Sequence, residues 1–400
     1  MRTQLSILAI AVGVLAAHPA PADTFTVNTT VDRSDADAAD GVCDVDPTTP
    51  GAQCTLRAAI QQANAIAGPS TIELPAGIYK LTMRGANEDG ATTGDLDING
   101  RLTIEGAGAK TTIIDAKRAK DRIFDILPAG NVTLTDVTLL RGRVGRGKAG
   151  GCVRNTGHLT LRRAVLTRCK SAGDGGALDS AGTATVTDVL FIQNKSRHDG
   201  GALTTIAGNV TVRRCTFAAN RAGGEGGALD SSAGTVDVTN STFTANRARL
   251  EGGAIVNEDN GVMTLTNCTI AGNEAKAGGG ISAQPGAGPS VSPTRLRNCI
   301  LADNKKANCE GAVISDGGNL DSGTSCAFGA GSLSGTDPKL GPLQDNGGLT
   351  PTLALAADSP AIDAGTDAEC PATDQRELPR RDIPGRGTAT CDIGAYEFQP

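Results

Sequence analysis

Short runs of alternating apolar and polar residues recur at nearly constant intervals along the middle of the chain. Three consecutive units between Gly175 and Asn246 each open with Gly-Gly-Ala-Leu and end with Phe-x-x-Asn, at intervals of 25 and 26 residues. Within a unit, apolar residues alternate with Thr, Arg, Asp or Ser, which is the period-two pattern of a strand with one buried face. No 3.6-residue period appears, so the pattern predicts short strands separated by glycine turns.

Three purely apolar columns emerge when the units are aligned, although the neighbouring positions are polar. A unit of about 25 residues made of short strands cannot bury such a face alone, so we expect copies to stack with like residue over like residue. The columns are Val153, Leu178, Leu203, Leu229, Ile255 and Ile281; Leu134, Leu161, Val186, Val212, Val238, Leu265 and Leu296; and Leu139, Leu166, Phe191, Phe217, Phe243, Ile270 and Leu301.

These columns predict an all-β fold, a right-handed parallel β-helix of about ten coils over residues 70–316. Parallel strands in neighbouring coils would lie ~4.8 Å apart, and the right hand follows from the preference of parallel crossover connections. The one clear amphipathic helix, from Cys54 to Ala65, would cap the open N-terminal end within a cap of residues 23–69. Residues 317–400 lose the repeat and form the predicted loop-rich C-terminal cap.

The composition agrees with a solenoid. Glycine supplies 53 of 400 residues, and the chain has two Tyr and no Trp. A compact globular domain of this length normally packs many aromatic rings, whereas stacked rows of small aliphatic side chains do not need them.

One row of polar residues is expected to be structural. A side-chain amide both donates and accepts hydrogen bonds, so stacked asparagines can bond from coil to coil. We therefore favour a structural ladder over a ligand-binding row, and Cys169 replaces asparagine where the ladder should stop. The ladder consists of Asn194, Asn220, Asn246, Asn273 and Asn304.

Residues 1–22 have the features of an export signal. Arg2 gives a positive start, an apolar stretch follows to Ala17, and the segment ends in Ala-Pro-Ala, a small-residue cleavage pattern. The apolar stretch is too short to span a bilayer. We expect cleavage after Ala22 and a secreted protein, extracellular or at the cell surface, with the periplasm as the alternative.

Charge and cysteine content narrow the possible partners. Without the signal, 36 basic and 43 acidic residues remain, a net charge of −7 that argues against a nucleic-acid or anionic-membrane surface. Eleven cysteines in an exported chain predict disulfides rather than metal ligation, with at least one thiol left over. The disulfide candidates bracket three loops outside the regular repeats: Cys43 and Cys54, Cys309 and Cys326, and Cys370 and Cys391.

Four carboxylates form a predicted column directly before the double glycines. Neighbours ~4.8 Å apart repel each other, and we expect a basic column four residues earlier to neutralise them in part. The alternative is a row of Ca²⁺ sites, because hard oxygen ligands suit this cation; no other cofactor is expected. The acidic column is Asp174, Asp199, Glu225 and Glu251, and the basic column is Lys170, Lys195, Arg221 and Arg247.

Asp179 and Asp230 are weak candidates for catalysis. They occupy the same position two coils apart, with Thr204 between them, and ~9.6 Å is the separation that two rungs imply. This is close to the ~6.5–9.5 Å between the carboxyl groups of inverting glycosidases. The scarcity of aromatic residues argues against a sugar-processing site, so we expect no catalytic residues.

Motifs at both ends resemble exported bacterial proteins. The segment CTLRAAIQQAN is similar to their CSLREA-type N-terminal domain, and the stretch from Ile72 to Asp115 and the GGALDS units are similar to their right-handed β-helix. The repeats also resemble those of polymorphic outer-membrane proteins and adhesins. DNGGLTPTLALAADSPAIDAG and CDIGAYEFQP resemble the choice-of-anchor Q region. Ala58 stands where that family has Glu, and Glu377 stands where Gly is usual.

The resemblance implies a pectate-lyase-like solenoid and an export route. We expect a secreted or surface-exposed structural or adhesive module that binds a protein partner or a surface polysaccharide. The alternatives are a polysaccharide lyase or glycoside hydrolase and a passive stalk. We further expect a monomer with no nucleic-acid partner. Membrane insertion is not expected, because no sorting signal or transmembrane tail follows the last motif.

Overall fold

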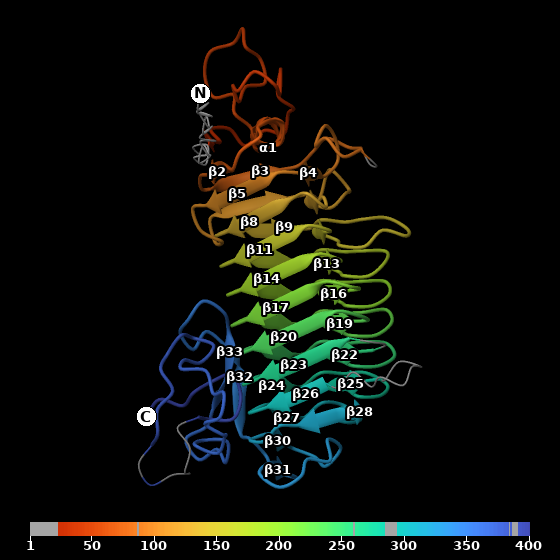
Figure 1. The fold of residues 1–400 in the computed structure, drawn as a ribbon, viewed down its shortest axis with the longest axis vertical. Coiled ribbons are helices and arrows are strands. Elements are labelled where there is room, and N and C mark those ends of the chain that lie inside the picture. The colour runs from red at the N-terminus through yellow and green to blue at the C-terminus, as the bar shows by residue number, and fades with distance from the viewer. Residues whose placement is uncertain (1–22, 86–87, 259–260, 285–293, 384, 386–390) are drawn as a thin grey trace, which may run out of the picture.

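The computed structural model is a parallel β-solenoid that carries one short helix at its N-terminal end (Figure 1). The structure describes residues 23–85, 88–258, 261–284, 294–383, 385 and 391–400. The predicted signal segment, residues 1–22, lies outside these ranges. No described helix is of the length and apolar character that a membrane crossing requires.

Three long sheets run the length of the solenoid, and every pairing within them is parallel. Sheet 1 contains β1 (Asp23–Thr26), β2 (Ser70–Leu74), β5 (Arg101–Gly106), β8 (Asn131–Thr135), β11 (His158–Arg162), β14 (Thr183–Thr187), β17 (Asn209–Arg213), β20 (Thr235–Thr239), β23 (Val262–Thr266), β26 (Thr294–Arg297) and β29 (Val313–Ser315). Sheet 2 contains β3 (Gly77–Lys80), β6 (Thr112–Asp115), β9 (Thr138–Leu140), β12 (Val165–Thr167), β15 (Leu190–Ile192), β18 (Thr216–Ala218), β21 (Thr242–Thr244), β24 (Thr269–Ala271), β27 (Ile300–Ala302), β30 (Leu320–Asp321) and β31 (Leu333–Ser334). Sheet 3 contains β4 (Leu96–Ile98), β7 (Phe124–Ile126), β10 (Val153–Asn155), β13 (Leu178–Ser180), β16 (Leu203–Thr205), β19 (Leu229–Ser231), β22 (Ile255–Asn257), β25 (Ile281–Ala283) and β28 (Cys309–Gly311).

The fold is the predicted all-β parallel solenoid, and it fits a right-handed β-helix. Nine strands of sheet 3 correspond to about eight turns between the first strand and the last, slightly fewer than the ten coils expected. The difference arises at the N-terminal end, where β2 and β3 belong to sheets 1 and 2 but no strand of sheet 3 precedes β4.

The apolar columns stack as predicted and form the core. Val186, Val212 and Val238 are direct partners on adjacent strands of sheet 1, and each is at most 1% exposed. In sheet 2, the rings of Phe191 and Phe217 lie parallel with centroids 4.6 Å apart, and the Phe243 ring continues the stack at the same distance. Buried side chains therefore repeat with the spacing of the backbone rungs.

The paired glycines make the corner before sheet 3. The first glycine, as in Gly200, has a φ of +58°, a conformation that residues with a Cβ rarely adopt. The second, as in Gly201, packs against the next coil so closely that a Cβ would lie 2.1 Å from the carbonyl oxygen of Gly227. Both positions therefore require glycine, for two different reasons.

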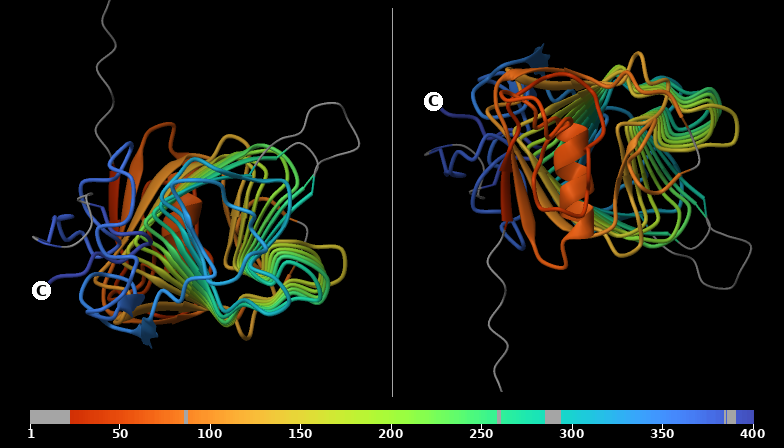
Figure 2. Two further views of the ribbon diagram at one scale, coloured as in Figure 1. Left: turned by 90° about the horizontal axis from the view of Figure 1, so that it is seen from below. Right: turned by 90° about the horizontal axis from the view of Figure 1, so that it is seen from above.

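Helix α1 (Leu56–Ala65) lies across the N-terminal opening of the solenoid (Figure 2). The Thr55 hydroxyl accepts a hydrogen bond from the Ala58 main-chain N–H and caps the helix start. The Arg57 side chain is fully buried, and its Nε donates to Asp32 at 2.7 Å while its Nη atoms donate to three carbonyls, including that of Gly94. These bonds join the helix to the first coil.

The C-terminal region is loop-rich, as expected, but most of it does not close the end of the solenoid. Strands β30 and β31 extend sheet 2 at that end. The chain then forms an antiparallel pair, β32 (Leu340–Gln344) and β33 (Thr352–Leu355), and continues along the side of the last coils (Figure 1). The Gln375 side chain bonds to Thr216 at 2.8 Å and to Thr242 at 2.7 Å. Glu377 has a φ of +67°, a conformation that favours glycine, and pairs with Arg214 at 3.0 Å.

Four disulfides are present in the described residues. Three are the candidates from the sequence, Cys43–Cys54, Cys309–Cys326 and Cys370–Cys391. The fourth, Cys152–Cys169, lies inside the repeats and was not predicted. Cys215, Cys268 and Cys299 are free and buried. Disulfides are typical of proteins that fold in an oxidising, extracellular-type compartment.

Candidate functional site

The asparagine row is a continuous hydrogen-bond ladder at the start of the loops between sheets 2 and 3. The Oδ1 atom of Asn220 accepts from both the main-chain N and the Nδ2 of Asn194, each at 3.0 Å. Its Nδ2 donates to Asn246 Oδ1 and to the Phe191 carbonyl, also at 3.0 Å. The same pattern continues to Asn304. Because these amides are buried and fully engaged, they hold the loop backbone and offer no face to a ligand.

The ladder ends where its hydrogen-bond partners change. At the N-terminal end, the main-chain N of Cys169 donates to Asn194 Oδ1 at 3.0 Å, and the Cys169 side chain is committed to a disulfide. At the other end, Asn304 donates to Asn308 Oδ1 at 2.8 Å. Asn308 belongs to the same loop as Asn304, so the last rung closes on itself.

The residue after each asparagine belongs to a row of cations. Main-chain bridges connect Arg143, Lys170, Lys195, Arg221, Arg247, Glu274 and Lys305 in that order. Glu274 is the acidic member of the row and pairs with Lys305 at 2.8 Å and with Arg247 at 3.3 Å. The hydrogen bond from Lys305 lowers the pKa of Glu274, and Arg247, Lys305 and Arg221 lower it further. The row therefore produces a positive potential along several coils.

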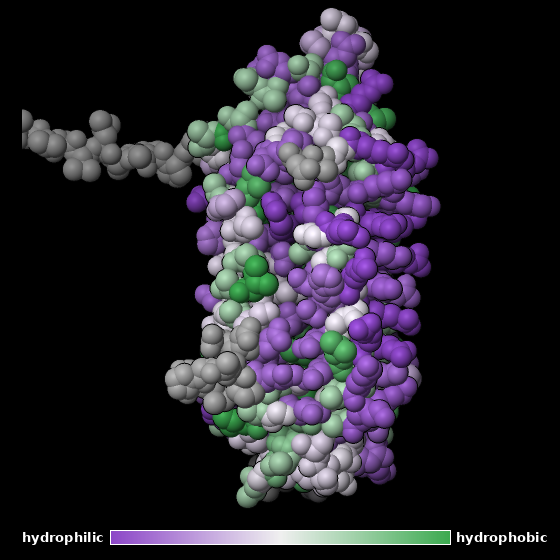
Figure 3. Space-filling model, turned by 90° about the vertical axis from the view of Figure 1, so that its right-hand side faces the viewer, coloured by the Kyte–Doolittle hydropathy of each residue, from purple (hydrophilic) through white to green (hydrophobic). Residues whose placement is uncertain are grey.

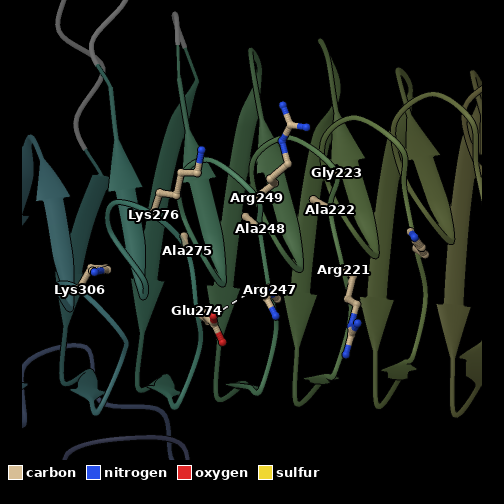
Figure 4. Close-up of a pocket in the computed structure, with 11 residues that line it drawn as sticks. Arg221, Ala222, Gly223, Arg247, Ala248, Arg249, Glu274, Ala275, Lys276 and Lys306 are labelled. Atoms are coloured by element: carbon tan, nitrogen blue, oxygen red, sulfur yellow. Dashed lines mark ion pairs between the residues drawn. The ribbon is translucent and has the colours of Figure 1, made fainter.

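A second set of cations and a floor of small residues turn this row into a groove. Ala222, Ala248 and Ala275 stack in a small buried cluster between Arg247 on one side and Arg249 on the other (Figure 4). This part of the groove has a volume of about 420 Å³. Figure 3 shows that hydrophilic side chains cover much of the face that carries the loops.

The groove continues toward the N-terminal end. A section of about 520 Å³ shares Lys195 and Gly223 with the first, and a section of about 480 Å³ shares Arg143 and Lys170 with the second. Glu274 is the one acidic residue among the described lining residues of the three sections. We call this surface the basic groove. Its cations are Lys117, Lys120, Arg141, Arg143, Arg146, Arg168, Lys170, Lys195, Arg197, Arg221, Arg247, Arg249, Lys276 and Lys306.

The acidic column has a different environment from the one predicted. The main-chain N of Asp199 donates to Asp174 at 3.1 Å, and the main-chain N of Glu225 donates to Asp199 at 2.7 Å. Glu251 accepts from Ser282 at 3.0 Å. Burial, followed by neighbouring carboxylates, raises the pKa of Glu225 to about 7. Among the described residues, no ion pair joins this column to the basic column; the carboxylates of Asp174 and Asp199 accept from the backbone of the following coil instead.

The structure also separates the two catalytic candidates. Asp179, Thr204 and Asp230 are partners on adjacent strands of sheet 3, as their positions in the repeats suggested. Asp230 is 1% exposed, and burial raises its pKa well above the usual value. Burial raises the pKa of Asp179 to about 6. Asp179 lines a cavity and lies two rungs from Asp230. The two carboxylates therefore do not flank a common accessible space.

The cavity beside Asp179 has a volume of about 330 Å³ and contains charges of both signs. Asp125 lies two rungs from Asp179 with Arg154 between them. Arg154 donates to Asp125 at 2.8 Å, and Arg122 donates to the same carboxylate at 2.7 Å. We call this space the acidic pocket; it is lined by Glu88, Asp89, Asp95, Arg122, Asp125, Gly147, Lys148, Ala149, Arg154 and Asp179.

Two carboxylates at this pocket have raised pKa values: Asp95, which lines it, and Asp97, which lies next to Asp95. Burial raises the pKa of Asp95 to about 6 although Arg122 opposes this. Burial and the adjacent Asp95 raise the pKa of Asp97 to about 8. One oxygen from each of Asp95, Asp97 and Asp125 lies within 4.8 Å of the others, a separation at which three carboxylates can hold a cation.

These residues could not be recognised from repeats that were aligned on their double glycine. Asp97 and Asp125 occupy the same position in their strands as Asp179, directly after the apolar column that contains Leu178. No Gly-Gly precedes their strands. An alignment anchored on Leu96 and Phe124 would have revealed the row.

Comparison with known proteins supports the fold. Residues 122–286 match the family model described as right handed beta helix region. The matched segment extends from just before β7 to just after β25. No curated protein and no solved structure gives a significant match.

Proposed function

We propose that this chain is a secreted, surface-exposed module that binds an acidic polysaccharide along the basic groove. The observation that carries the proposal is the unbroken row from Arg143 to Arg247, in which each coil adds one cation. Neighbouring coils are ~4.8 Å apart, which is less than the Debye length of ≈ 8 Å at physiological ionic strength. The electric fields of neighbouring cations therefore overlap. An extended polymer with regularly spaced negative charges can pair with successive cations of the row.

The composition of the groove favours a polymer over a small ligand. The alanine floor leaves room for a chain to lie along the axis, and cations stand on both sides of it. Exposed ion pairs contribute only 0.2–1 kcal/mol each, so useful affinity requires many contacts at once, as a long polymer provides. The four disulfides and the predicted signal segment support a location outside the cell.

The alternative, a polysaccharide lyase or glycoside hydrolase, receives less support. The pair Asp179 and Asp230 does not share an accessible space, and Asp230 is 1% exposed. The two ends of the sequence resemble CSLREA-type and choice-of-anchor Q regions. This resemblance bears on export and on the type of protein, and it identifies no catalytic chemistry. Adhesion to an acidic glycan is therefore the proposed role, without catalysis.

Charge reversal within the groove tests this role. Lys195 and Arg221 are exposed neighbours in the row, and the double variant Lys195→Glu/Arg221→Glu replaces attraction by repulsion. Arg162→Glu/Arg213→Glu is the matched control, because both arginines are exposed on sheet 1 and the change in net charge is the same. Binding to immobilised polygalacturonate is measured by surface plasmon resonance at several salt concentrations.

The groove variant should bind at least about tenfold more weakly, since two exposed pairs change sign. The control should change less than about threefold, and neutral dextran should not bind. Equal losses in both variants, or tighter binding to duplex DNA than to polygalacturonate at the same salt concentration, would show that the proposal is wrong.

A further inference from the structure

Three carboxylates from two adjacent coils meet beside the acidic pocket, and two of them, Asp95 and Asp125, line it. Asp97 in β4 and Asp125 in β7 are direct strand partners, and Asp95 immediately precedes β4. Their exposed fractions are 1%, 3% and 4%. An ionised carboxylate at such a depth needs a compensating charge, because leaving a buried charge unpaired is strongly unfavourable.

Protein cations compensate only part of this charge. Arg122 Nη1 donates to Asp95 Oδ2 at 2.8 Å and to Asp125 Oδ2 at 2.7 Å. Arg154 donates to both oxygens of Asp125 at 2.8 Å. Two guanidinium groups thus pair with Asp95 and Asp125, and no arginine of the described residues forms an ion pair with Asp97.

Asp97 is the incompletely bonded member of the group. Its Oδ2 accepts one hydrogen bond, from the main-chain N of Ala91 at 2.9 Å. Its Oδ1 is buried and has no hydrogen-bond partner. A buried acceptor without a partner costs about 1–3 kcal/mol, and more when it is charged. The oxygen therefore lacks a positive partner, and the Asp97 carboxylate lies next to Asp95 and Asp125, which line the pocket.

We propose that the acidic pocket binds one Ca²⁺ ion through Asp95 and Asp97, with Asp125 beside them. All candidate ligands are carboxylate oxygens, which suit a hard cation and not the nitrogen- and sulfur-seeking Zn²⁺. Ca²⁺ accepts six to eight oxygens in flexible geometry, and water in the adjoining cavity of about 330 Å³ can supply those that the protein does not. Mg²⁺ demands a near-ideal octahedron and fits three unevenly placed carboxylates less well.

The second buried acidic cluster in the described residues accepts several main-chain and guanidinium hydrogen bonds. It consists of Asp363, Asp392 and Glu397 in the C-terminal region. Main-chain N–H groups of Asp363 and Phe398 donate to the two oxygens of Asp392, at 2.7 and 2.6 Å. Arg380 and the main-chain N of Arg381 donate to Glu397 at 2.8 Å. In that cluster main-chain or guanidinium donors reach all three carboxylates, whereas Asp97 accepts a single main-chain hydrogen bond.

A cation in the acidic pocket would join the N-terminal cap to the first coils. The loop before β4 contains Ala91, whose carbonyl accepts from Arg57 of helix α1, and the same loop provides Asp95. Asp125 lies in the next coil. Ca²⁺ would therefore stabilise the end of the solenoid that α1 covers, independently of any polymer in the basic groove.

Isothermal titration calorimetry and thermal unfolding test the site. The full-length protein is treated with chelator, dialysed and titrated with CaCl₂; about one Ca²⁺ per chain and a higher Tm are expected. Asp97→Asn preserves the shape but removes the charge, and should weaken Ca²⁺ binding at least about tenfold and abolish the rise in Tm. Asp237→Asn, at an exposed position of β20, is the matched control and should retain both.

Several outcomes would overturn the proposal. They are no heat and no change in Tm with the wild type, an undiminished response in Asp97→Asn, or an equal loss in Asp237→Asn. If Asp97→Asn fails to fold, as judged by circular dichroism, Asp95→Asn replaces it and the same criteria apply. MgCl₂ at the same concentration gives the selectivity, and a stronger response to Mg²⁺ than to Ca²⁺ would contradict the assigned ion.

Discussion

Asn220→Ala should destabilise the solenoid far more than its lack of charge suggests. The Asn220 side chain is fully buried and makes four hydrogen bonds of 3.0 Å, two through Oδ1 and two through Nδ2. A typical intramolecular hydrogen bond contributes about 1 kcal/mol net, so the four sum to roughly 4 kcal/mol. Alanine also removes the partner of the buried main-chain N–H of Asn194, which makes this sum a conservative figure.

The measurement is urea-induced unfolding followed by far-UV circular dichroism. Asn209→Ala is the matched control, because Asn209 lies in the same coil at the exposed start of β17. The control should change the free energy of unfolding by no more than about 0.5 kcal/mol. If Asn220→Ala stays within 1 kcal/mol of Asn209→Ala, the ladder does not contribute as the hydrogen bonds imply, and the additive reasoning is refuted.

Two further changes test buried charge and covalent cross-linking. Burial keeps the pKa of Asp230 in the folded chain well above its value in the unfolded chain. The folded chain therefore retains a proton that the unfolded chain loses as pH rises above about 4. This difference in proton binding lowers the stability of the fold with increasing pH. Asp230→Asn removes the term and should raise the free energy of unfolding by roughly 1–3 kcal/mol at pH 8, with little difference at pH 4; a variant less stable than wild type at pH 8 would contradict this. Cys152→Ser/Cys169→Ser opens a loop of 17 residues and should cost about 3 kcal/mol in urea unfolding without reductant. An unchanged midpoint would show that the cross-link does not constrain the unfolded chain.

The repeat geometry could be predicted because it is encoded locally and many times over. Each coil repeats the same apolar positions, and one correct alignment therefore places Val186 beneath Val212 and Phe191 beneath Phe217. The coil count was slightly high because β2 and β3 contain apolar strand residues although their coil lacks a strand in sheet 3. Loop residues there take the place of the strand, and the period of the sequence does not distinguish such a coil from a complete one.

The position of the C-terminal region could not be predicted in the same way. Its attachment depends on single polar contacts, such as that between Gln375 and Thr242, whose partners are 133 residues apart in the chain. Such contacts leave no period in the sequence. The predicted cap was therefore correct in its loop-rich character but incomplete in its placement along the side.

The candidate sites were partly visible in the sequence. The basic column was recognised, but the overall negative charge obscured its extent, and the opposite side of the groove depends on how the loops at Arg197 and Arg249 turn. The carboxylate cluster beside the acidic pocket combines Asp95, which precedes a strand, with Asp97 and Asp125 from two adjacent coils. Only the folded chain brings these groups together, because their spacing follows no single repeat.

The C-terminal segment bonds to hydroxyls on consecutive rungs, through Gln375 at Thr216 and Thr242 and through Ala395 at Thr269. These contacts require the three hydroxyls to keep the spacing of three consecutive coils. Gain or loss of a whole unit between Thr216 and Thr269 would move these hydroxyls out of reach, whereas a unit duplicated before Leu190 would leave them in place. Evolutionary changes in length are therefore expected in the N-terminal half, where each added coil would also extend the basic groove by one rung.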